Sequence, residues 1–187
     1  MRPSSRVALP ALTLLLAAAP LLAQGADPST ATGLRKELIA QLDDGEKKLV
    51  ALAEAVPQEK YGWRPAEGVR SVSEVFVHVA MANYMFPRMA GVTRAPDVTL
   101  PRDAEKTITG RAQVVDLLHK SFAFARQGVM DVPEAQMDAT VDMFGTPTTR
   151  RGVLVTMATH LHEHLGQSIA YARSNGVVPP WSAGGGN

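Results

Sequence analysis

Apolar residues recur at helical spacing in four separate stretches of this chain, with no convincing strand-like alternation between them. The stretches run from Gly33 to Val56, from Val72 to Tyr84 or Met85, from Arg111 to Met130, and from Thr148 or Thr149 to Ser174. Spacings of three, four and seven place apolar side chains on one face of a helix. Four amphipathic helices of this length predict an all-α fold, a four-helix bundle.

Local signals mark several ends of these helices. Ser71 and Glu74 have the spacing of a capping box just before the second apolar stretch. Pro57 stops the first helix, and Pro87 is expected to mark the end of the second.

The connections between the helices are long. They comprise residues 58–70, 91–108 and 133–147, the last with room for a short extended piece. At about 3.3 Å per extended residue, each connection could run the length of a helix. Crossover and up-and-down topologies both stay open.

The first 26 residues have the pattern of a secretory signal peptide. Arg2 and Arg6 precede an apolar run from Val7 to Leu22, and small residues at 23–26 offer a cleavage site. An uncleaved anchor helix is the alternative, whereas a lipid anchor is excluded because the chain has no cysteine. We therefore expect an exported protein, periplasmic or extracellular, with a bundle domain over residues 27–182 and a flexible tail at 183–187.

Composition excludes several classes of function. Without Arg2 and Arg6 the 19 Lys and Arg residues become 17, against 18 Asp and Glu, which gives a net charge of −1. The sequence contains no stripe of basic residues interleaved with aromatic ones, so nothing in it indicates nucleic-acid binding. Apart from the run at Val7 to Leu22, no apolar run approaches the roughly 20 residues that span a bilayer. With no cysteine, any metal must be held by nitrogen and oxygen ligands.

Histidines cluster near the end of the sequence. The chain has five, and His160, His162 and His164 lie within five positions. His160 and His164 are four apart, so they share one helix face and could grip one ion. His162 points away by roughly 200° around the helix, and we interpret it as solvent-facing or as an outer-shell group that supports the ligands.

A third candidate ligand lies in the second helix. His78 shares a face with Val75, Ala82 and Met85 and is therefore expected to point inward. A buried polar group without a partner costs about 1–3 kcal/mol. A hydrogen bond to a backbone carbonyl would satisfy a lone core histidine, but an inward histidine pair on a neighbouring helix makes a shared metal the better account.

Several segments together resemble the DinB/YfiT-like family of four-helix-bundle metalloenzymes. They are Tyr61-Gly-Trp-Arg-Pro65, Gly68-Val-Arg-Ser-Val-Ser-Glu74 leading to His78, His160-Leu-His-Glu-His-Leu-Gly-Gln167, and Tyr171 to Trp181. In that family, a histidine of the second helix and two on the last helix bind one divalent metal. The resemblance thus implies metal ligands at His78, His160 and His164. Many members have His-His-x-Gly-Gln, and Glu163 replaces the first histidine here, outside the ligand positions.

Three neutral imidazoles leave an open position on the ion, which is typical of a catalytic site. Zinc is the default expectation, while nickel, manganese, iron and cobalt stay open because nitrogen ligands do not select one metal. Glu74 is a candidate general base or outer-shell acceptor, with helix capping as its alternative role. Gln167, one turn beyond His164, is a candidate to orient a ligand ring.

Two metal-site frameworks do not match. A zincin requires H-E-x-x-H, and Gly166 stands where the second histidine would be. Paired Glu-x-x-His motifs of di-iron bundles are missing. Two functions stay open: a metal-dependent hydrolase or thiol transferase acting on an unknown small molecule, and a metal-binding or stress-associated module without turnover. Whether the chain forms a homodimer is also open.

Overall fold

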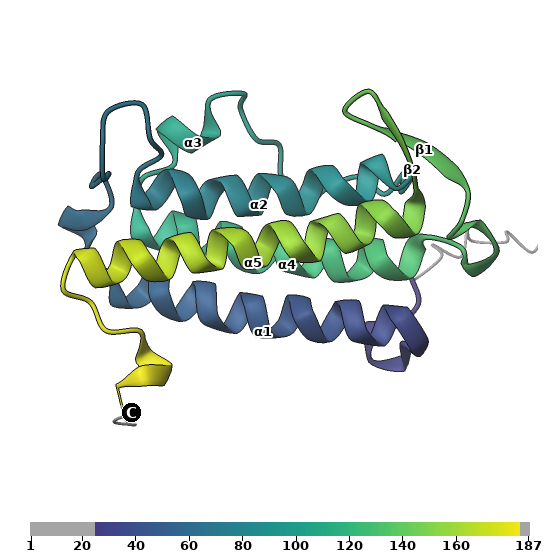
Figure 1. Cartoon of the computed structure of the whole chain (residues 1–187), viewed down its shortest axis with the longest axis horizontal. Coiled ribbons are helices and arrows are strands. Elements are labelled where there is room, and N and C mark those ends of the chain that lie inside the picture. Colours follow the sequence, from purple (N-terminus) through teal and green to yellow (C-terminus); the bar gives the residue numbers. More distant parts are fainter. Residues whose placement is uncertain (1–24, 184–187) are drawn as a thin grey trace, which may run out of the picture.

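The computed structural model describes residues 25–183, and within them four long helices form a bundle (Figure 1). The predicted signal peptide and tail therefore lie almost entirely outside the described residues. The bundle helices are α1 (Gly33–Ala55), α2 (Val72–Met89), α4 (Arg111–Asp131) and α5 (Arg150–Ser174). The connections contain a short helix α3 (Ala104–Thr107), strands β1 (Thr140–Met143) and β2 (Thr146–Thr149), and single 3₁₀ turns. The predicted four-helix bundle is confirmed.

The topology is a crossover rather than a simple up-and-down arrangement. Both α1 and α2 pack mainly on α4 and α5, so the consecutive helices α1 and α2 lie diagonally across the bundle. The chain after α2 runs back along that helix, with α3 over its first half (Figure 1). Consequently α4 runs parallel to α2, as two contacts between them show: Asn83 with Ser121 and Pro87 with Gly128. The long connections predicted from the sequence serve this topology.

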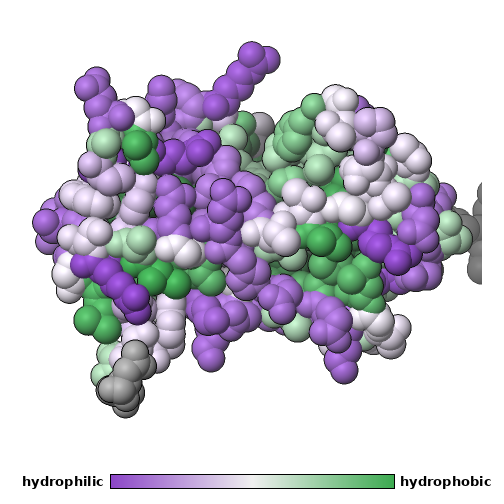
Figure 2. All heavy atoms as spheres, in the orientation of Figure 1, coloured by the Kyte–Doolittle hydropathy of each residue, from purple (hydrophilic) through white to green (hydrophobic). Residues whose placement is uncertain are grey.

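The core contains apolar side chains from all four long helices. The largest fully buried ones include Phe76 of α2, Phe122 of α4, Leu154 and Leu161 of α5, and Leu42 of α1. The face shown in Figure 2 is mostly hydrophilic, with separate apolar patches. In the described part of the chain, no helix is long and apolar enough to cross a membrane.

The predicted end of α2 at Pro87 is wrong, because the helix continues through this proline to Met89. A proline inside a helix lacks an N–H and crowds the carbonyl four residues before it. Here its ring packs against α4 where Gly128 has no side chain: a Cβ added there would lie 2.6 Å from the Pro87 Cβ. The predicted capping box at the other end is present, with Ser71 and Glu74 bonded to each other's backbone N–H groups.

Two connections contain regular structure, of which only the short extended piece in the third was expected from the sequence. In the second connection, Glu105 belongs to the single-turn helix α3. In the third, β1 and β2 form an antiparallel hairpin that pairs Met143 with Thr146. Phe144 and Gly145 form its two-residue turn with φ angles of 55° and 82°, the positive values that a tight hairpin favours. The all-α expectation holds, and the hairpin is the short extended piece for which the third connection has room.

Candidate metal centre

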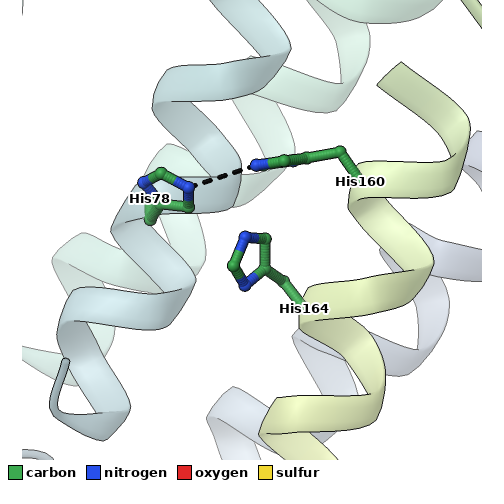
Figure 3. Close-up of side chains that lie close together, drawn as sticks. All are labelled: His78, His160 and His164. Carbon is green, nitrogen blue, oxygen red and sulfur yellow. Dashed lines mark hydrogen bonds between the residues drawn. The ribbon is translucent and has the colours of Figure 1, made fainter. Parts of the chain in front are cut away.

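Three histidine side chains meet between α2 and α5, as Figure 3 shows. His78 comes from α2, and His160 and His164 come from successive turns of α5. One ring nitrogen of each lies within 4.8 Å of the corresponding nitrogens of the other two. The Nε2 atoms of His78 and His160 are 3.1 Å apart. The structure therefore brings together the three residues proposed from the sequence as ligands.

Helix packing explains this convergence. Residues four apart share a helix face, and that face of α5 packs on α2. His164 is buried, with 8% of its surface exposed, whereas His78 and His160 are half-buried. Phe86 closes one side of the cluster by packing edge-on against His160 at a ring separation of 5.3 Å.

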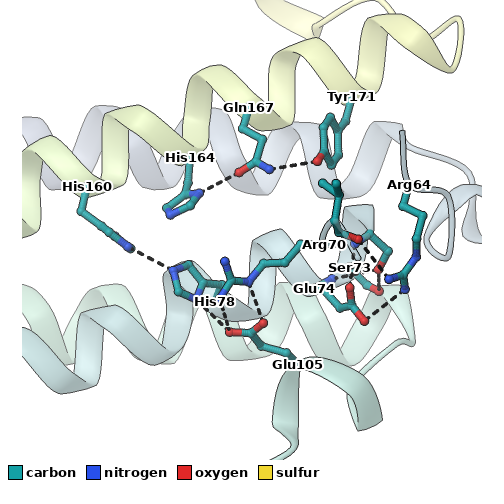
Figure 4. Close-up of polar contacts among 12 residues, drawn as sticks. Arg64, Arg70, Ser73, Glu74, His78, Glu105, His160, His164, Gln167 and Tyr171 are labelled. Carbon is teal, nitrogen blue, oxygen red and sulfur yellow. Dashed lines mark hydrogen bonds and ion pairs between the residues drawn. The ribbon is translucent and has the colours of Figure 1, made fainter. Parts of the chain in front are cut away.

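Glu105 holds the outer nitrogen of His78, and sequence reasoning missed this residue. Its Oε1 lies 2.8 Å from His78 Nδ1, and its Oε2 accepts a 2.7 Å hydrogen bond from Arg70 Nε. Figure 4 shows this Arg70–Glu105–His78 arrangement beside the other two histidines. An ionised carboxylate can only accept, so His78 carries its proton on Nδ1 and presents an Nε2 lone pair to the cluster.

Gln167 plays the corresponding part for His164. Its Oε1 lies 2.8 Å from His164 Nδ1, and its amide nitrogen donates to the Tyr171 hydroxyl at 2.9 Å (Figure 4). Trp63 packs edge-on against the Tyr171 ring at 5.3 Å. This is the hydrogen bond that an orienting role for Gln167 requires, and it leaves Nε2 of His164 facing the other histidines.

Burial favours the neutral form of two rings of the cluster, His160 and His78. Desolvation, together with the neighbouring His164, His78 and Arg70, lowers the pKa of His160 to about 4. Burial also lowers the pKa of His78, although the hydrogen bond that His78 donates to Glu105 acts in the opposite direction. Neutral imidazole is the form that coordinates a metal ion.

The residues present fit a divalent metal ion. Two nitrogens each about 2.0–2.1 Å from zinc can be at most about 4.2 Å apart, so the 3.1 Å separation between His78 and His160 is compatible with a shared ion. Two of the three rings have their second nitrogen hydrogen-bonded to a carboxylate or amide oxygen. Histidine metal ligands almost always show such a bond.

The other candidate from the sequence, Glu74, lies away from the three rings. Its carboxylate accepts from the Ser71 backbone N–H at 2.7 Å and from Arg64 at 3.2 Å. It lines the same cleft as Glu105 and Gln167 but bonds to no histidine of the cluster. Its catalytic role stays a prediction, and its capping role is present.

The remaining histidines take no part in the cluster. The interpretation of His162 as solvent-facing needs correction: it is half-buried, and among the described residues its Nε2 has no hydrogen-bond partner. Glu163 is exposed. His119, in α4, bonds to Glu46 of α1 at 2.7 Å.

Two openings flank α2 on either side of His78. A polar cleft of about 620 Å³ contains both residues that bond the outer nitrogens of the cluster. Its lining is Arg64, Gly68, Val69, Arg70, Glu74, Glu105, Lys106 and Gln167. An apolar groove of about 570 Å³ lies further along α2, lined mainly by Met81, Met85, Met89, Val98 and Leu100. Of these two openings, the polar cleft is therefore the one whose lining residues form hydrogen bonds with the histidines.

Comparison with known families and structures gives a consistent picture. The model of the DinB superfamily matches residues 41–168, which include all three histidines of the cluster. None of the curated proteins matches the sequence.

Three solved structures share the fold. A DinB-like protein from Bacillus cereus has 16% identity and a TM-score of 0.66, covering 78% of this chain and 95% of its own. A DinB-like protein from Bacillus subtilis has 19% identity and a TM-score of 0.58, with coverages of 75% and 92%. A conserved protein from Enterococcus faecalis has 18% identity and a TM-score of 0.60, with coverages of 76% and 97%. At these identities the likeness concerns the fold.

Proposed function

This chain belongs to the DinB superfamily, and on that premise we propose that it is a metal-dependent hydrolase or thiol transferase acting on a small molecule. One divalent ion is held by His78, His160 and His164, with zinc as the first candidate and nickel, manganese, iron or cobalt as others. The observation that carries this proposal is the convergence of three ring nitrogens, two of them on rings fixed by Glu105 and Gln167.

The protein's own residues supply the orientation that such chemistry needs. Glu105 and Gln167 each hold one ring with its Nε2 toward the centre. With three protein ligands, a bound ion keeps a position at which water can be made acidic or a substrate oxygen or sulfur polarised. The polar cleft is lined by Glu105 and Gln167, the residues that hold two of these rings, and it is therefore the route that we propose for a substrate.

A module that binds metal without turnover is the second candidate, and a specific observation favours it. Both carboxylates of the cleft are engaged, Glu74 with Ser71 and Arg64, and Glu105 with Arg70 and His78. Neither is free to act as a general base in the arrangement described. A metal-loaded protein that turns over no ester, amide or thiol substrate would favour this module.

We also propose that the protein is exported to the periplasm or beyond. Arg2, Arg6 and the apolar run from Val7 to Leu22 support this. Export favours hydrolysis over thiol transfer, because a low-molecular-weight thiol is scarcer outside the cytosol. Cell fractionation with detection of the shortened chain tests this proposal, and retention of the full-length chain in the cytosol would contradict it.

Metal analysis tests the central proposal. The purified protein, reconstituted with zinc and dialysed, should contain one ion per chain. His78→Ala and His164→Ala should each lose most of it, whereas His119→Ala, a histidine outside the cluster, should retain it. Wild-type protein without stoichiometric metal after reconstitution would overturn the proposal.

A further inference from the structure

The polar cleft beside the histidines is unevenly charged. It is lined by three cationic side chains, Arg64, Arg70 and Lys106, and by two carboxylates, Glu74 and Glu105, which leaves a formal charge of +1. The three histidines add no negative charge, so a bound divalent ion would make this region more positive still. The cleft thus has the electrostatics of a site for an anion.

Its carboxylates are already committed to other groups. Glu74 accepts from the Ser71 backbone and Arg64, which also donates to the Val69 carbonyl. Glu105 accepts from Arg70 and from His78. Each carboxylate of the cleft is thus paired with an arginine, and the pairing fixes the positions of Arg64 and Arg70.

Two cationic donors stay available. Within residues 25–183, the Lys106 ammonium has no carboxylate in ion-pair distance, and Arg70 uses Nε and one terminal nitrogen on Glu105 while its Nη1 has no acceptor. Lys106 directly follows Glu105 in α3. The same short helix therefore holds both the group that orients His78 and an unpaired cation at the cleft.

We propose that this cleft binds the anionic group of the substrate, a carboxylate or phosphate, through Lys106 and the free edge of Arg70. The inference rests on the proposed function, because it makes the cleft the substrate-binding part of the metal site. An anion held there lies beside Glu105 and Gln167, one side chain away from His78 and His164. The substrate class is then a small anionic molecule whose reactive bond reaches the ion.

Titration with simple anions tests this proposal in two arms. In the first, Co²⁺-loaded protein is titrated with acetate, inorganic phosphate and neutral acetamide at low salt, and the visible absorption of cobalt is recorded. In the second, metal-free protein is titrated with the same probes, and NMR shifts of amides around the cleft are followed. We expect at least one of the two anions, but not acetamide, to bind in both arms. Whether acetate or phosphate binds more tightly identifies the anionic group.

The decisive variant is Lys106→Gln, which removes the charge from an exposed side chain. A hydrogen bond to a charged group is worth about 1.5–3 kcal/mol, so anion affinity should fall about tenfold or more. Lys60→Gln is the matched control, because Lys60 is an exposed lysine outside the cleft. It should change affinity less than about twofold, because its side chain does not line the cleft and so makes no direct contact with a bound anion.

The outcomes separate the two proposals. Failure of the protein to take up Co²⁺ overturns the metal proposal but leaves the metal-free arm to decide on the anion site. Normal Co²⁺ uptake without binding of either anion overturns the anion site alone. Equal losses of anion affinity in Lys106→Gln and Lys60→Gln would also overturn it, because binding would then depend on the overall charge of the protein. No loss in either variant would overturn it as well, because the anion would then bind without Lys106.

Discussion

At the scale of single residues, the outer hydrogen bonds of two histidines determine which nitrogen each offers to an ion. Glu105 fixes His78, and Gln167 fixes His164. Removing such an outer partner typically lowers metal affinity 10–100-fold. The two positions can be tested separately, each against a control variant of the same residue type.

We expect Glu105→Ala to lower metal affinity about 10–100-fold, because His78 loses the acceptor that fixes its Nδ1 proton. Competition with a chromophoric chelator measures this change. Glu74→Ala is the control in the same cleft: it should leave metal affinity within about threefold while costing about 1 kcal/mol of stability through the lost cap. A larger affinity loss for Glu74→Ala than for Glu105→Ala would restore Glu74 as the important carboxylate.

Gln167→Leu should lower metal affinity about tenfold, because leucine keeps the approximate size but cannot accept the proton of His164 Nδ1. Tyr171→Phe removes only the more distant bond to the Gln167 amide and should have a smaller effect. The same chelator competition compares them, with Gln113→Leu on the exposed surface of α4 as the control. Equal affinities for Gln167→Leu and wild type would show that Gln167 does not orient the ring.

At the scale of elements, close approach of α2 and α4 depends on one glycine. A Cβ on Gly128 would lie 2.6 Å from Pro87 Cβ and 2.9 Å from its Cγ, and the proline ring cannot rotate away. Gly128→Ala should therefore destabilise the protein by about 1–3 kcal/mol, as measured by chemical unfolding.

Gly166→Ala is the matched control within α5. A Cβ there meets nothing within 4 Å, and the site is exposed, so alanine should stabilise by about 0.5–1 kcal/mol through its helix propensity. If both variants unfolded at the same denaturant concentration, stability would not depend on the close packing of Pro87 on Gly128.

Elements also explain what the sequence could and could not reveal. The helices that carry His78, His160 and His164 follow from apolar periodicity, which reports the burial of a long face. Glu105 was missed because it lies in a single-turn helix whose place over α2 depends on tertiary contacts with Arg70 and His78. Likewise, a proline in an isolated helix favours an end, and the packing of Pro87 against Gly128 of α4 is a tertiary contact that the sequence does not show.

At the scale of the whole molecule, the histidine cluster joins α2 to α5, which are far apart in sequence. The order of the helices around the bundle was open from the sequence, because long connections permit several topologies. The crossover places α2 antiparallel to α5, so that residues 78 and 160 meet. An ion at this point would bind the folded bundle and not the separated helices of the unfolded chain.

Metal should therefore raise the stability of the entire bundle. A ligand that binds only the folded state stabilises it by about 2.7 kcal/mol at 100 times its Kd. For a domain of this size that corresponds to an increase of very roughly 5–10 °C in Tm. Thermal unfolding with excess zinc and with excess chelator measures the difference.

The variant His160→Ala connects this stabilisation to the cluster. Its Tm should be the same with zinc and with chelator, because two remaining histidines bind zinc far more weakly than three. His119→Ala should retain the full zinc-dependent increase, since His119 contacts Glu46 on a different pair of helices. A zinc-dependent increase that persists in His160→Ala would place the stabilising ion elsewhere, and the connection between α2 and α5 would then not depend on metal.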